Sequence, residues 1–183
     1  SKLDDIAWIF NLRGSDVPDN PVFYAYSLIP AKGNATLFIN EEKVPADLKE
    51  QLAEEGVVLA PYHSVGAALA SLSSGTVLAD PEEINASLLS RLPEQITQLE
   101  LPNPIELMKA LKTPEEIELI SEAMLKDGVA LVRFFAWLDR NLGKEEMTEQ
   151  SLADKLLYFR KSLPGYISLS FETISAFGPN AAL

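Results

Sequence analysis

The sequence predicts an α/β domain followed by the incomplete beginning of an α+β block. Over residues 1–102, short apolar runs rich in aromatic and β-branched residues alternate with amphipathic stretches, and this alternation stops at a proline-bounded segment. The charge balance changes at the same point: residues 1–102 hold 6 Lys and Arg against 15 Asp and Glu, whereas residues 103–183 hold 9 against 12. We therefore expect two domains, over residues 1–102 and 103–183.

In the first domain, strands are expected where apolar residues cluster between Gly, Pro, Asn and Asp, at residues 6–10, 22–29, 36–39, 57–60, 76–79 and 96–101. Helices are expected at residues 45–55, which end at Gly56, and at residues 65–72. Asp80 followed by Pro81 is typical of a helix N-cap and first turn, so a third helix is expected there. Strands that alternate with helices indicate a mixed sheet flanked by helices.

In the second domain, two helices and a strand are expected after the linker over residues 101–104, where two prolines oppose regular structure. Thr113 and Glu116 have the spacing of a capping box and predict a helix over residues 113–142 with one apolar stripe. Thr148 predicts a second helix that ends before Pro164. Residues 167–174 alternate between apolar and polar, which predicts a half-buried strand. Because one strand is too few to close a sheet, this block looks like half of a domain.

Composition excludes several classes of function. The net charge of −12 disfavours nucleic acid, because phosphates must be neutralised by Lys and Arg. No apolar stretch approaches the length of about 20 residues that a membrane span needs, and the first residues do not resemble a signal peptide. The absence of cysteine excludes disulfides and thiolate metal sites and fits a reducing compartment. We therefore expect a cytoplasmic protein that binds neither nucleic acid nor a membrane.

The sequence holds no pattern of residues that predicts catalysis. His63 is the only histidine, so a nucleophilic triad or a histidine-rich zinc site is not expected, and His63 is interpreted as a polar residue in a turn. Most carboxylates fall in expected first turns of helices or on solvated faces, and the glycines form no phosphate-binding pattern. The expectation is therefore no catalytic residue, no metal ligand and no cofactor within this segment.

One stretch suggests a family. The run IAWIFNLRGSD over residues 6–16, followed by NPVF over residues 20–23, resembles the start of the middle domain of Xaa-Pro aminopeptidases of the three-domain aminopeptidase P type. Its polar residues suit an architectural role: Asn11 and Arg13 could bond backbone carbonyls, Gly14 permits a tight turn, and Asp16 could pair with Arg13 or cap the loop. The resemblance continues at residues 103–105, 113–116, 152–160 and 169–183.

The resemblance implies a creatinase-like middle domain over residues 1–102 and the N-terminal part of a pita-bread metallopeptidase domain over residues 103–183. It also implies a pair of divalent metal ions, usually manganese, that hydrolyses peptides with proline at the second position, in an enzyme that is commonly a homodimer. The metal ligands of the family would fall after Leu183. Phe177 and Asn180 would then lie at the approach to the substrate pocket.

Two hypotheses follow from these observations. The first is that the chain is a segment of an Xaa-Pro aminopeptidase and is inactive alone. The alternative is a non-enzymatic interaction module built on a creatinase-like domain. The sequence that follows Leu183 distinguishes them, because only the enzyme requires metal ligands there.

Overall fold

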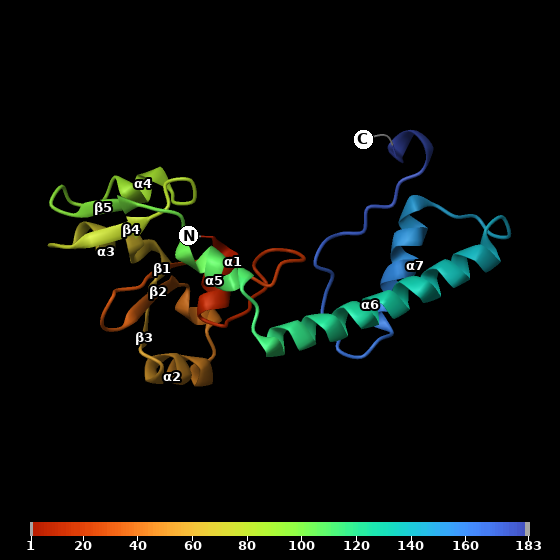
Figure 1. Cartoon of the computed structure of the whole chain (residues 1–183), viewed down its shortest axis with the longest axis horizontal. Coiled ribbons are helices and arrows are strands. Elements are labelled where there is room, and N and C mark those ends of the chain that lie inside the picture. Colours follow the sequence, from red (N-terminus) through yellow and green to blue (C-terminus); the bar gives the residue numbers. More distant parts are fainter. Residues whose placement is uncertain (1, 182–183) are drawn as a thin grey trace. The chain divides into compact units, whose positions relative to one another are not determined.

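The computed structural model describes residues 2–181 and divides the chain into two compact units, Ser1–Leu111 and Lys112–Leu183. In unit 1, strands and helices alternate along the chain, whereas the described part of unit 2, residues 112–181, consists of two α-helices, irregular segments and a short 3-10 helix at Gly178–Ala181 (Figure 1). The α/β class with a mixed sheet and flanking helices is therefore confirmed for unit 1. The predicted boundary after residue 102 stays a prediction; in the structure, contacts between residues divide the chain nine residues later.

A mixed three-stranded sheet forms the centre of unit 1. β1 (Ala25–Leu28) pairs antiparallel with β2 (Ala35–Ile39), which pairs in parallel with β3 (Val57–Pro61). Two further strands, β4 (Thr76–Ala79) and β5 (Thr97–Glu100), form a separate parallel pair. The predicted strand over residues 22–29 is shorter than expected, because its first three residues precede β1 and include buried side chains outside the ladder.

Helices cover both faces of the sheet. Leu37 and Ile39 of β2 join a core that includes Leu52 from α2 (Ala46–Glu54), whereas Phe38 packs with Val65 and Leu69 from α3 (Val65–Ala70). This alternation is the period-two pattern of a strand buried on both faces. α2 ends where Gly56 adopts a φ of 78°, a left-handed conformation that glycine adopts without a steric penalty.

The prediction of a strand at residues 6–10 is wrong, because these residues form the end of helix α1 (Leu3–Ile9) and its C-cap, Phe10. Its apolar residues Leu3, Ile6 and Phe10 recur at intervals of three and four and face the core, and Asp4 and Asp5 occupy the helix's positive first turn. A run of five apolar residues does not distinguish strand from helix, and the deciding residues lie upstream of that run.

Two predictions around the prolines are also corrected. The helix expected at Asp80 is reduced to α4 (Ala86–Leu89), which Asn85 caps, while the Asp80 carboxylate accepts the Glu82 N–H at 3.0 Å in a turn. The expected linker contains the start of α5 (Pro104–Ala110), because Pro104 occupies the first helical position, where its missing N–H costs nothing. α5 packs against α1 within unit 1.

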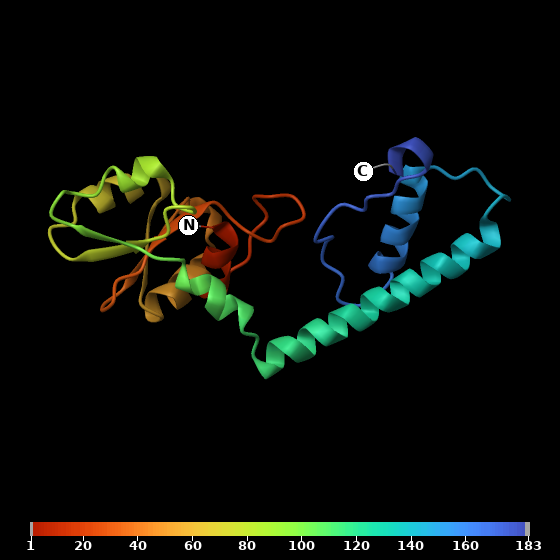
Figure 2. The ribbon, with the colours of Figure 1, turned by 45° about the horizontal axis from the view of Figure 1, so that its top comes forward.

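Unit 2 is built on the long helix α6 (Pro114–Asn141) and the shorter α7 (Glu149–Lys161), which pack together and are seen from a second angle in Figure 2. Both predicted caps are present: Thr113 Oγ1 accepts the Glu116 N–H at 3.2 Å, and Glu116 accepts the Thr113 N–H at 2.8 Å. Thr148 caps α7 in the same manner with Ser151.

The predicted strand over residues 167–174 is not formed. These residues are irregular, because no segment among residues 2–181 supplies the ladder hydrogen bonds that a strand requires. The apolar stripe of α6 is exposed over much of its length, with Met124 at 65% and Phe135 at 60% exposure. Among residues 2–181, no helix combines the length and the apolarity needed to cross a membrane.

Candidate functional site

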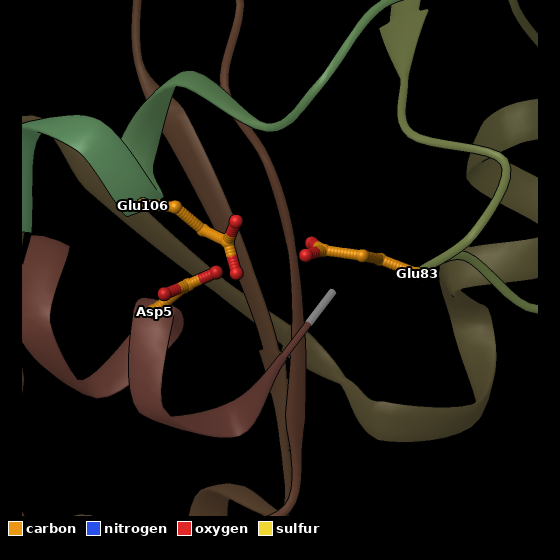
Figure 3. A group of neighbouring side chains, drawn as sticks. All are labelled: Asp5, Glu83 and Glu106. Atoms are coloured by element: carbon orange, nitrogen blue, oxygen red, sulfur yellow. The ribbon is translucent and has the colours of Figure 1, made fainter.

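Three carboxylates from separate segments of unit 1 gather at one point (Figure 3). Asp5 comes from α1, Glu83 from the turn after β4, and Glu106 from α5; one oxygen of each lies within 4.8 Å of the others. Asp5 is buried, with 2% of its surface exposed, whereas the side chains of Glu83 and Glu106 are 8% and 45% exposed. Oxygen ligands at this spacing are of the kind that divalent cations prefer, so the cluster is the first candidate site.

Two lysines already form ion pairs with this cluster. Lys2 Nζ lies 2.6 Å from Glu83 and also binds Glu106, while Lys109 Nζ lies 2.6 Å from Asp5 and also binds Asp4. Hydrogen bonds to Glu106 and then Glu83 raise the pKa of Lys2, and the hydrogen bond from Lys2 is the main cause that lowers the pKa of Glu83. Both groups therefore stay charged at neutral pH.

Asn103 completes the network. Its Nδ2 donates to Asp5 at 2.7 Å and to Glu83 at 3.1 Å, and its Oδ1 accepts the Ile105 N–H to cap α5. Its own N–H donates to Asp80 at 3.1 Å. The cluster thus joins α1, the turn after β4 and the start of α5 through ion pairs and hydrogen bonds. The cluster does not fit a metal pair, because each of its three carboxylates is already paired with a lysine ammonium group.

The loop that carries the family signature is held by its own polar groups. Arg13 Nη1 donates to the carbonyls of Ala7 and Leu12, at 3.2 and 2.9 Å. Asn11 adopts a φ of 49° where α1 ends, and its N–H donates to the Trp8 carbonyl at 3.0 Å.

Gly14 and Asp16 fix the same loop against the following chain. A Cβ at Gly14 would come within 2.7 Å of the Phe23 Cβ, so the close approach of the two segments requires glycine. Asp16 accepts the Tyr24 N–H at 2.8 Å and pairs with Lys43 at 2.6 Å, so its cationic partner is Lys43.

A hollow of about 770 Å³ lies at the carboxyl ends of β2 and β3, and it contains His63. The Tyr62 ring stacks with Tyr26 at 5.2 Å and meets the edge of His63 at 5.2 Å. Burial, together with a hydrogen bond to Tyr26, raises the pKa of Tyr62. Sequence reasoning singled out this histidine without predicting the aromatic wall beside it.

In unit 2, a second hollow of about 770 Å³ lies between the helices and the irregular segment over residues 163–173. Arg160 on its wall forms a bidentate pair with Asp127, at 2.7 and 3.2 Å. The two residues predicted at a pocket approach, Phe177 and Asn180, do not line this hollow. They lie in an exposed turn whose polar groups bind the carboxylate of Glu149.

Comparisons with known proteins agree on one family. The sequence model of the creatinase/prolidase N-terminal domain matches residues 1–116. A probable Xaa-Pro aminopeptidase P of Ajellomyces capsulatus is 39% identical over all of this chain, and aminopeptidase P2 of Arabidopsis thaliana is 34% identical. The chain spans about a third of the length of these relatives, 32% and 30% respectively.

A solved structure extends the likeness to the fold. The X-prolyl aminopeptidase of Caenorhabditis elegans, described as a cytosolic enzyme with a di-nuclear active site, superposes with a TM-score of 0.85 and 31% identity. The match covers 95% of this chain and 29% of that one. Because the family model matches residues 1–116, more than half of this chain, the chain belongs to the creatinase/prolidase N-terminal domain family.

Proposed function

We propose that this chain is a segment of a metal-dependent Xaa-Pro aminopeptidase, an enzyme that removes an N-terminal residue preceding proline. The observation that carries the proposal is the match to the nematode X-prolyl aminopeptidase, which extends over 95% of the chain and through both units. A likeness restricted to unit 1 would support only a shared domain. The continuous match supports a shared protein.

The chemistry of the proposed enzyme is assigned to residues outside this chain. A divalent metal pair, with manganese as the proposed ion, would need several carboxylate and imidazole ligands in one cavity. The carboxylates of the three-carboxylate cluster (Asp5, Glu83 and Glu106) are already paired with two lysines, and His63 lies apart from them in a separate hollow. This segment therefore contributes scaffold, and Phe177 and Asn180 are proposed to lie at the approach to the substrate pocket.

The proposed substrates are peptides with proline at the second position, and the proposed enzyme is a cytoplasmic homodimer that binds neither nucleic acid nor a membrane. The net charge of −12 supports the exclusion of nucleic acid. The solved neighbour's description as a cytosolic enzyme supports the compartment.

Two measurements test the proposal. Isothermal titration of the 183-residue chain with Mn²⁺ should detect no tight site, and the chain should not cleave a tripeptide with proline at the second position. The protein encoded by the longer reading frame that contains this chain should cleave that peptide in a metal-dependent manner. Tight Mn²⁺ binding or turnover by the chain itself would contradict the assignment of the metal ligands and of catalysis to residues outside this chain. A reading frame without metal ligands would instead favour an interaction module.

A further inference from the structure

The turn of residues 177–180 is tied to helix α7 by one carboxylate. Glu149, the first residue of α7, accepts the Phe177 N–H on Oε1 at 2.6 Å. The Asn180 Nδ2 donates to both carboxylate oxygens, at 3.1 and 3.0 Å. Three hydrogen bonds thus connect segments that lie about 30 residues apart in the sequence.

Packing contributes little to holding this turn. The Phe177 side chain is 85% exposed, and the Asn180 N–H returns to the Phe177 carbonyl at 3.3 Å. Gly178 adopts a φ of 58°, which bends the chain sharply and directs the Phe177 N–H and the Asn180 amide toward the same carboxylate. The position of the turn relative to α7 therefore depends on hydrogen bonds to a charged acceptor, which are stronger than those between neutral groups.

We propose that Glu149 is a positioning residue: it holds the Phe177–Asn180 turn against α7 and thereby sets the approach to the substrate pocket. The catalytic part of this inference rests on the proposed function, whereas the anchoring part rests on the hydrogen bonds alone. Glu149 touches no reacting atom, so its effect on catalysis is indirect.

The chemistry of the contact specifies a matched pair of variants. Glu149→Gln keeps the size of the side chain but turns one acceptor into an NH₂ donor, which would face the Asn180 amide donor. Adding Asn180→Asp supplies an acceptor for that new donor and restores the net charge of the wild type. The double variant should therefore rebuild the contact with its donor and acceptor exchanged, while each single variant should only weaken it, because Glu149→Gln keeps one acceptor oxygen for the Phe177 N–H.

The anchoring is tested on the 183-residue chain by hydrogen–deuterium exchange. Glu149→Ala should increase the exchange rate of the Phe177 amide about tenfold, as expected for loss of one charge-assisted hydrogen bond. Glu149→Gln and Asn180→Asp should each give a smaller increase, and the double variant should return toward the wild-type rate. Glu146→Gln removes the same charge at an exposed position before α7 and should leave the rate unchanged. An unchanged rate in Glu149→Ala would overturn the inference.

The catalytic consequence is tested in the longer protein that contains this chain. There, Glu149→Ala should lower kcat/KM about tenfold, mainly through KM, Glu149→Gln should lower it by a smaller factor, and Glu146→Gln should leave it unchanged. If the enzyme is active but both constants are unchanged in Glu149→Ala, the positioning role is wrong. If exchange changes as expected but the longer protein cleaves no Xaa-Pro peptide, the anchor stands and the proposed function fails.

Discussion

The buried carboxylate of Asp5 gives the sharpest test of how unit 1 is held together. Asp5 and its neighbour Asp4 both pair with Lys109, but Asp5 is 2% exposed and also accepts from Asn103, whereas the Asp4 side chain is 51% exposed. The substitutions Asp5→Asn and Asp4→Asn therefore remove the same charge beside the same lysine. They differ in burial and in the number of partners left unsatisfied.

The expected cost follows from these contacts. Asp5→Asn turns an acceptor into a donor in a dry site, where losing a hydrogen bond to a charged group costs about 1.5–3 kcal/mol. Lys109 keeps Asp4 and is 28% exposed, so the larger penalty of about 3–5 kcal/mol for isolating a buried charge does not apply. We expect Asp5→Asn to lower the free energy of unfolding by about 2 kcal/mol, and Asp4→Asn by about 0.5 kcal/mol or less.

The assay must report on unit 1 alone. The chain has two tryptophans, Trp8 in α1 of unit 1 and Trp137 in α6 of unit 2. In a Trp137→Phe background, Trp8 fluorescence during urea unfolding follows unit 1. For a domain of this size, about 2 kcal/mol corresponds to a fall in Tm of roughly 8–16 °C. Equal losses of stability in Asp5→Asn and Asp4→Asn would refute the argument from burial.

Further predictions concern the signature loop, the long helix, acid stability and the carboxylate cluster. Gly14→Ala should destabilise unit 1 by about 1–3 kcal/mol in the same assay, because the added Cβ would meet Phe23. Gly128→Ala should instead stabilise α6 by about 0.5–1 kcal/mol, because the added Cβ meets nothing within 4 Å and alanine favours the helix. The hydrogen bond from Lys43 is the main cause that lowers the pKa of Asp16 in the folded state, so Asp16 contributes stability above its unfolded pKa of about 3.9 and loses it as pH falls through the folded pKa. Asp16→Asn should therefore flatten the decline of the urea midpoint between pH 5 and pH 2.5; an unchanged slope would contradict this. Adding Mn²⁺ or Ca²⁺ at millimolar concentration should not raise the Tm of unit 1, because lysines occupy the three-carboxylate cluster; a clear increase would make that cluster a metal site.

Local signals predicted the parts of the fold that depend on local physics. The Thr113 capping box, the strand at residues 36–39 and the helix end at Gly56 each involve a few neighbouring residues, and all three are present in the structure. The errors arose where distant residues decide. Residues 6–10 became a helix because Leu3 and the first-turn aspartates complete a helical pattern, and residues 167–174 lack a strand partner within residues 2–181.

The polar network was less accessible to sequence reasoning. Asn103 appeared to be a linker residue beside two prolines, yet its side chain joins Asp5 and Glu83, which lie 98 and 20 residues away. Glu149 showed only the preference of an acidic residue for a helix N-terminus, and its bonds to the turn at residues 177–180 carry no sequence signature. Long-range pairing of this kind depends on the tertiary fold, which single-sequence patterns do not encode.

The proposal that this chain is part of an Xaa-Pro aminopeptidase is tested most directly by one cleavage experiment. The longer protein that contains the chain is incubated with Mn²⁺ and two tripeptides that differ only in having proline or alanine at the second position, and release of the first residue is measured. We expect release from the proline peptide, loss of that release with a metal chelator, and far slower release from the alanine peptide. No metal-dependent release from the proline peptide by the folded protein would contradict it.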